Sequence, residues 1–135
     1  MYGTFLGCTH FNQPIGNWNT SNVITMEFMF STTVDFNQSI ENWDTKNVTN
    51  MSRMFMHAKN FNQPLDKWNV SNVKDMEYMF LHTYKFNQPL NNWNISNVQF
   101  MNCMFYNTKN FNELNCIHWD LRHIEDKYKL DMFKE

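Results

Sequence analysis

The sequence has little of what several large protein classes require. Its net charge is only −2 and its pI about 6.2, so we expect no basic surface for nucleic acid or for an anionic membrane. It has only 3 cysteines, an odd number at unrelated positions, and these do not make a disulfide framework. No apolar run approaches the length of a membrane span, and no secretory signal is recognisable. These absences predict a soluble chain with no nucleic-acid partner and no membrane insertion.

What the sequence does have is one unit that recurs every 25 positions. The unit reads F-N-Q-P-L-x-x-W-N-x-S-N-V-x-x-M-x-x-M-F followed by five variable residues. A single unit cannot bury its own apolar face, whereas stacked units make one continuous core. We therefore expect a single solenoid domain over residues 1–135, ending in a charged cap at residues 115–135 that shields the open end. The repeats start near residues 11, 36, 61, 86 and 111.

Two periodicities within the unit predict its secondary structure. Trp43 and Thr45 have the two-residue spacing of a short strand. Val23 and Phe30 begin and end a set of four apolar residues at helical spacing, and the asparagine before the valine can cap that helix. The expected fold class is thus α/β, a solenoid of about five repeats with short parallel strands and short helices. An all-helical unit is the alternative, but residues 36–45 lack the helical period that a second helix needs.

The motifs F-N-Q-P-L, W-N-x-S-N-V and M-F resemble those of the BspA-like repeats, a divergent leucine-rich-repeat group. The resemblance covers residues 4–114, and residues 115–135 depart from it. Repeats of this length are common in mycoplasma surface lipoproteins, and BspA-like repeats also occur in protists and large DNA viruses. The resemblance implies a leucine-rich-repeat-like solenoid without enzymatic activity, a location at a cell surface or in a virion, and adhesion or protein binding.

Asparagine occupies the second position of every unit. Stacked amides can hydrogen-bond from one repeat to the next and satisfy backbone groups at the corners. A polar recognition strip is the alternative interpretation of the same column. We predict a structural ladder that consists of Asn12, Asn37, Asn62, Asn87 and Asn112.

A second polar set lies between the Trp and Thr positions of the predicted strands. Its members should point to the outer face of the sheet, which solenoids present to their partners. A simply solvated sheet face is the alternative. The predicted partner-binding residues are Asn19, Asp44, Asn69, Asn94, Asp120, Lys46 and Arg122.

No set of residues predicts catalysis. His57 and His82 share one repeat position and should be neighbours, but the equivalent residues are Thr32 and Asn107, so a metal ion lacks further ligands. Cys8 falls in a column of small packing residues, which argues against a catalytic cysteine. We expect no catalytic residue, no metal site and no cofactor.

The two ends of the array differ. Residues 4–10 are a fragment of a unit, so the N-terminal end lacks a cap, and exposed apolar surface invites contact with another chain. We therefore predict a non-enzymatic scaffold for protein–protein interaction or adhesion. Its partner is another protein, or a second copy, bound through the N-terminal end. A structural subunit of a larger assembly, such as a virus particle, is the alternative.

Overall fold

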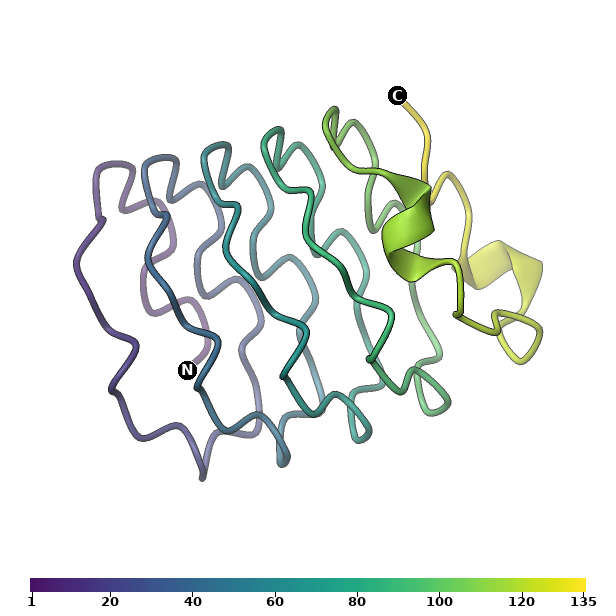
Figure 1. The fold of residues 1–135 in the computed structure, drawn as a ribbon, viewed down its shortest axis with the longest axis horizontal. Helices are drawn as coiled ribbons and strands as arrows, with labels where there is room; N and C mark the ends of the chain where they lie inside the picture. Colours follow the sequence, from purple (N-terminus) through teal and green to yellow (C-terminus); the bar gives the residue numbers. More distant parts are fainter.

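The computed structural model describes residues 1–135, which wind into a stack of coils with the two termini toward opposite ends (Figure 1). Each repeat makes one coil. An N-terminal half-coil of residues 1–10 precedes five coils, named here by their residues. These are coil 1 (11–35), coil 2 (36–60), coil 3 (61–85), coil 4 (86–110) and coil 5 (111–135).

The predicted fold class, an α/β leucine-rich-repeat-like solenoid of short strands and helices, is wrong. The regular elements are two 3₁₀ helices in coil 5, η1 (Glu113–Cys116) and η2 (Asp126–Tyr128). Neighbouring coils pair through isolated parallel bridges at a single residue per coil. These bridges join Thr25 to Asn50, Asn50 to Asp75 and Asp75 to Phe100. The structure has neither a sheet nor an α-helix, so the all-helical alternative fails as well.

The segment predicted as a helix is a series of tight turns. In coil 1 the Met29 N–H donates to the Met26 carbonyl at 3.1 Å, and Phe28, the third residue of that turn, has a φ of 56°. A positive φ at this place fits a type II turn and excludes a right-handed helix. The first and last residues of a four-residue turn are three apart, so turns mimic the apolar spacing of a helix. The left-handed φ recurs at Phe28, Thr32, Arg53, His57, Tyr78, His82, Cys103 and Asn107.

Alternate residues of this turn segment join one coil to the next. Phe28 and Phe30 donate their N–H groups to the Ser52 and Met54 carbonyls of coil 2, at 3.2 and 2.8 Å. Ser31, which follows them, closes a turn within its own coil by donating to the Phe28 carbonyl at 3.1 Å. This alternation satisfies the backbone without either α-helix or β-sheet.

The segment predicted as a strand also turns. The Trp43 N–H donates to the Ile40 carbonyl at 3.2 Å, and the Val48 N–H donates to the Thr45 carbonyl at 2.9 Å. Although the Leu90 N–H of coil 4 donates to the Asn115 carbonyl of coil 5, the hydrogen bonds that cross between the coils here from coil 1 to coil 4 involve side chains. The indole Nε1 of Trp68, for example, donates to the Ile40 carbonyl of the preceding coil at 3.0 Å.

The core consists of columns in which each side chain stacks on its own kind. The ring centroids of Phe30 and Phe55 lie 5.6 Å apart with an interplanar angle of 7°. Those of Trp43 and Trp68 lie 6.5 Å apart at 3°. Thirty buried apolar residues form one continuous cluster through the stack, so the large rings bury their surface mainly against neighbouring coils.

Coil 5 departs from the repeat less than the sequence suggested. Trp119 stacks on Trp93 at 6.2 Å, and Phe133 stacks on Phe105 at 5.6 Å and 2°. The repeat spacing would place that last ring at position 130, so coil 5 accommodates three extra residues before its Met-Phe pair. The charged segment 115–135 therefore continues the core columns, which the sequence analysis missed.

Candidate functional site: the polar columns and the N-terminal end

The asparagines of the predicted ladder lie one above another along the stack. The Asn62 N–H donates to Asn37 Oδ1, and the Asn87 N–H donates to Asn62 Oδ1, both at 3.0 Å. Gln63 Nε2 donates to the same oxygen of Asn37 at 3.0 Å. The side chain thus acts through its acceptor oxygen, which holds both the backbone and the glutamine of the next coil. The same backbone contact joins Asn12 to Asn37 and Asn87 to Asn112.

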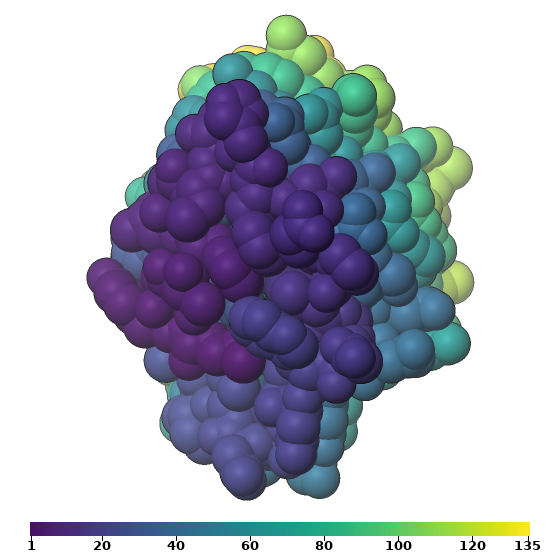
Figure 2. Space-filling model, turned by 90° about the vertical axis from the view of Figure 1, so that its left-hand side faces the viewer, coloured from purple at the N-terminus to yellow at the C-terminus, as the bar shows by residue number.

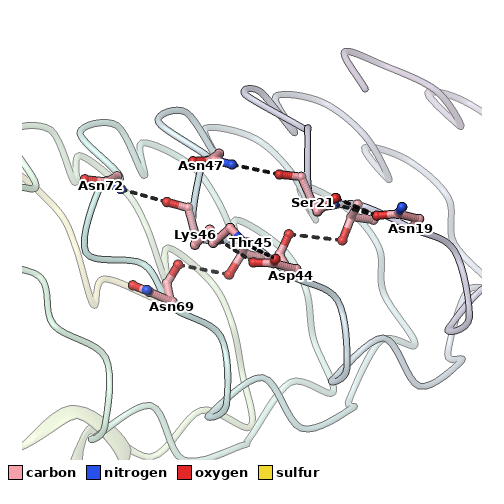
Figure 3. A network of polar contacts seen from close by, with 9 residues as sticks. Asn19, Ser21, Asp44, Thr45, Lys46, Asn47, Asn69 and Asn72 are labelled. Carbon is pink, nitrogen blue, oxygen red and sulfur yellow. Dashed lines mark hydrogen bonds and ion pairs between the residues drawn. The ribbon is translucent and has the colours of Figure 1, made fainter.

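The residues predicted to bind a partner do not lie on a sheet face, because no sheet forms. Asn19, Asp44, Lys46 and Asn69 lie in a row of turns along one side of the stack (Figure 3). Asn94, Asp120 and Arg122 belong to the equivalent turns of coils 4 and 5. Asn69 Oδ1 accepts hydrogen bonds from the N–H of Ser71 at 3.0 Å and from its Oγ at 2.6 Å. Such a side chain stabilises the turn in which it lies. Partner binding by this row stays a prediction. The contact to the N–H two residues ahead recurs at Asn19, Asp44, Asn94 and Asp120.

Two carboxylates in this row form ion pairs with the basic residues predicted beside them. Lys46 Nζ lies 2.9 Å from Asp44 Oδ2, and hydrogen bonding from Lys46 lowers the pKa of Asp44. Arg122 contacts both oxygens of Asp120, at 2.8 and 2.6 Å, and lowers the pKa of Asp120. The pairs are exposed, so they contribute little to stability and keep both carboxylates ionised at neutral pH.

A second asparagine ladder was missed in the sequence, where these residues were interpreted as helix caps. Asn47 Nδ2 donates to the Ser21 carbonyl at 2.8 Å, and Asn72 Nδ2 donates to the Lys46 carbonyl at 2.7 Å (Figure 3). Each contact therefore ties one coil to the coil before it. The unvarying register of the asparagine was the available signal, since a residue that recurs with the repeat lies above its own copy.

The two histidines of one repeat position are stacked neighbours. The rings of His57 and His82 lie 4.7 Å apart at 17°, and Asn107 Nδ2 lies 2.8 Å from His82 Nδ1. Burial lowers the pKa of both histidines, and the positive charge of Lys59 lowers each further. No group of three or more His, Cys, Asp or Glu side chains is placed to hold a metal ion.

The three cysteines are free thiols. Burial raises the pKa of Cys116 to about 12, and burial together with the charge of Asp131 raises the pKa of Cys103. Both thiols are therefore protonated at neutral pH, whereas a nucleophilic cysteine needs its thiolate.

The N-terminal end of the stack faces the viewer in Figure 2, and several of its aromatic side chains are exposed or only partly buried. Trp18 is 39% exposed, whereas the equivalent Trp68 is 3% exposed in coil 3. Phe5 and Phe11 stack at 3.9 Å and are only partly buried. Tyr2 and Leu6 of the half-coil are exposed. The half-coil thus covers only part of coil 1.

Stacked coils of one repeat, joined by columns of like residues, define the chain as a coil-stack repeat protein. The family described as "Mycoplasma protein of unknown function, DUF285" matches residues 1–81 and again residues 39–135. The chain belongs to this family, which is consistent with a mycoplasma-type repeat of the BspA-like kind. The family match does not confirm a leucine-rich repeat, and the structure has no strands of that type. No curated protein and no solved structure matches the chain. None of its helices has the length and apolar character needed to span a membrane.

Proposed function

We propose that this protein is a non-enzymatic repeat scaffold that binds another protein through the N-terminal end of the stack. The proposal rests on a contrast between the sides of the stack, where polar side chains are hydrogen-bonded, and its N-terminal end, where apolar rings are exposed. Along the sides, side-chain oxygens such as Asn62 Oδ1 and Asn69 Oδ1 are already engaged in the ladder and in the turns. At the N-terminal end, apolar rings such as Trp18 remain partly exposed. Exposed aromatic surface is typical of protein interaction sites.

The state of the reactive groups supports a non-enzymatic role. The carboxylates of Asp44 and Asp120 are ionised in exposed pairs, so neither can act as a general acid at neutral pH. Burial keeps the Cys116 thiol protonated. Binding by shape and by apolar contact remains the function that this arrangement serves best.

The finer assignment to BspA-like repeats is part of the same proposal. It rests on the F-N-Q-P-L and W-N-x-S-N-V motifs, and it favours adhesion or protein binding at a cell surface. A structural subunit of a larger assembly is the second candidate. It is favoured by the absence of Lys, Arg, Asp and Glu from residues 1–26, because permanent interfaces are depleted of charge.

The test compares variants of the two surfaces in binding to an extract of the cells that encode the protein. Thr4→Asp places a charge at the exposed N-terminal end, and Ile24→Lys is the matched control. Ile24 is also exposed, on the side of the stack, and coil 3 has Lys74 at the same position. A protein retained by the wild type and by Ile24→Lys, but lost with Thr4→Asp, supports the proposal. Equal retention by all three contradicts it.

A further inference from the structure

We infer that the partner of the N-terminal end is the C-terminal end of a second copy of this chain, so that copies stack head to tail. The inference rests on the proposed role of the N-terminal end as a contact surface. The occupant of that surface follows from the direction in which the backbone hydrogen bonds run along the stack.

Through their turn segments, the half-coil and coils 1 to 4 donate intercoil backbone hydrogen bonds only to the coil that follows. Phe5 of the half-coil donates its N–H to Met29 of coil 1 at 2.9 Å, and Phe105 of coil 4 donates to Met132 of coil 5 at 2.9 Å. The same step joins each pair of successive coils in between. The donors of this segment thus face the C-terminal end of the stack and the acceptors face the N-terminal end.

This polarity leaves complementary groups without partners at the two ends. In the half-coil, the carbonyls that correspond to acceptors in later coils belong to Tyr2, Thr4 and Leu6, and they accept no hydrogen bond. In coil 5, the N–H groups at the donor positions belong to Asp131, Phe133 and Glu135, and they have no acceptor. Each set has three groups at alternate residues, as in the contacts inside the stack.

The internal register fixes how the two sets meet. Cys103 donates to Leu130, the position that Tyr2 occupies in the half-coil, and Phe105 donates to Met132, the position of Thr4. By the same step, Asp131 of one copy donates to Tyr2 of the next copy. Phe133 then donates to Thr4, and Glu135 donates to Leu6. A second copy therefore continues the ladder without a change of register.

The apolar surfaces of the two ends are continuous under the same stacking. Phe5, Phe30, Phe55, Phe80, Phe105 and Phe133 form one column with ring spacings of 5.5 to 5.6 Å. Both end rings, Phe5 and Phe133, are partly buried, and within this column each stacks on only one other ring, Phe30 and Phe105 respectively. A second copy supplies the missing ring to each of them.

An apolar groove lies in coil 5 between residues 113–121 and the Met132–Phe133 pair. Its volume is about 250 Å³, and Leu114, Ile117, Trp119 and Phe133 are among its lining residues. Leu114 and Ile117 are both 61% exposed. They lie in or directly after η1, on the part of the coil that residues 13–17 form in coil 1. The groove therefore lies on the side where the half-coil leaves Trp18 of the next copy uncovered.

The test measures the mass of the 135-residue chain by sedimentation velocity over a range of concentrations. A head-to-tail contact joins two different surfaces and does not close on itself, so the wild type should form dimers and then longer species. Thr4→Asp at one end and Ile117→Lys at the other should each give monomers. Ile24→Lys is the control and should associate like the wild type. Circular dichroism melts establish that every variant is folded.

Mixing the two end variants separates the possible contacts. Thr4→Asp keeps an intact C-terminal end, and Ile117→Lys keeps an intact N-terminal end, so an equimolar mixture should double in mass and grow no further. Self-association of Ile117→Lys alone would show an N-terminal to N-terminal contact and overturn the inference. A wild type that stays monomeric at the highest concentration would also overturn it. That last result leaves the proposed function standing, provided that Thr4→Asp still loses a protein retained from the extract.

Discussion

One repeat position holds a buried threonine in coils 1, 3 and 4, whereas coil 2 has an alanine there. The Thr83 Oγ1 donates to the Phe55 carbonyl at 2.7 Å, and Thr33 and Thr108 make the same contact with the preceding coil. Ala58 occupies this position in coil 2 and is fully buried. The Phe30 carbonyl consequently accepts only the hydrogen bond of its own turn, from the Thr33 N–H.

Ala58→Thr should stabilise the protein by about 0.5–1.5 kcal/mol, because it adds one buried hydrogen bond in a place where neighbouring coils already hold threonine. Urea denaturation gives the free energy of unfolding. Ala58→Val is the matched control, since it has the same shape without the hydroxyl. If the valine variant is as stable as the threonine variant, the hydroxyl contact contributes nothing.

The stacked histidines should make stability depend on pH. The pKa of His57 and of His82 is lowered in the folded protein by burial and by positive charge, whereas in the unfolded chain each titrates near its ordinary value of about 6.5. As the pH falls through about 6.5, the unfolded chain therefore binds protons first. The folded state loses stability until the pH falls below the folded pKa.

The double variant His57→Asn, His82→Asn should remove this loss. Asn107 already occupies the same position in coil 4 with a φ of 52°, so asparagine suits the backbone there. The measurement is the free energy of unfolding at pH 7.5 and 5.5 for both proteins. An equal loss in the wild type and the double variant would assign the pH dependence to other groups.

The turn is the element that the sequence analysis misjudged. The repeat length, the register and the core columns of Phe, Trp, Val and Met follow directly from identical residues at identical spacing. The secondary structure did not follow, because the first and last residues of a four-residue turn are three positions apart. Consecutive turns therefore place Met26, Met29 and Phe30 at the spacing of a helix face. Their left-handed residues include Phe28 and Arg53, which carry no sequence signal for a positive φ. The half-coil does carry that signal in Gly3 and Gly7, the residues at the equivalent positions.

The asparagine ladder could be predicted from its column, but its chemistry could not. The amide oxygen of Asn37 accepts hydrogen bonds from both the Asn62 N–H and Gln63 Nε2. Which atom of the amide is used depends on the turn geometry. The predicted sheet face failed for the same reason, since Asn69 accepts from Ser71 only because the chain turns there.

Thr32→Asn should relieve strain in one of these turns. Thr32 has a φ of 57°, which costs a β-branched residue about 1–2 kcal/mol and costs asparagine less. We expect a gain of about 0.5–1 kcal/mol in the free energy of unfolding. Thr32→Val keeps the branched side chain and should give no gain. A valine variant as stable as the asparagine variant would show that the turn is not strained.

At the scale of the whole molecule, stability depends on contacts between successive coils. Trp68 lies between Trp43 and Trp93 at 6.5 Å from each and donates to the Ile40 carbonyl. Trp68→Ala should cost about 3–5 kcal/mol, and the short stack should still unfold in one transition, now at a lower temperature. Calorimetry measures both. Two separate transitions would mean that the coils on either side of Trp68 fold independently.

The backbone pattern repeats without change from the half-coil to coil 4, and this sets how the molecule can vary in length. Inserting or deleting one whole unit leaves every remaining donor opposite its usual acceptor, because the step from Phe30 to Met54 equals the step from Phe55 to Met79. Each added unit moves the two ends apart by about the 5.6 Å that separates the rings of Phe30 and Phe55. Unequal recombination within the gene would therefore change the reach of the protein in fine steps while its two end surfaces stay the same.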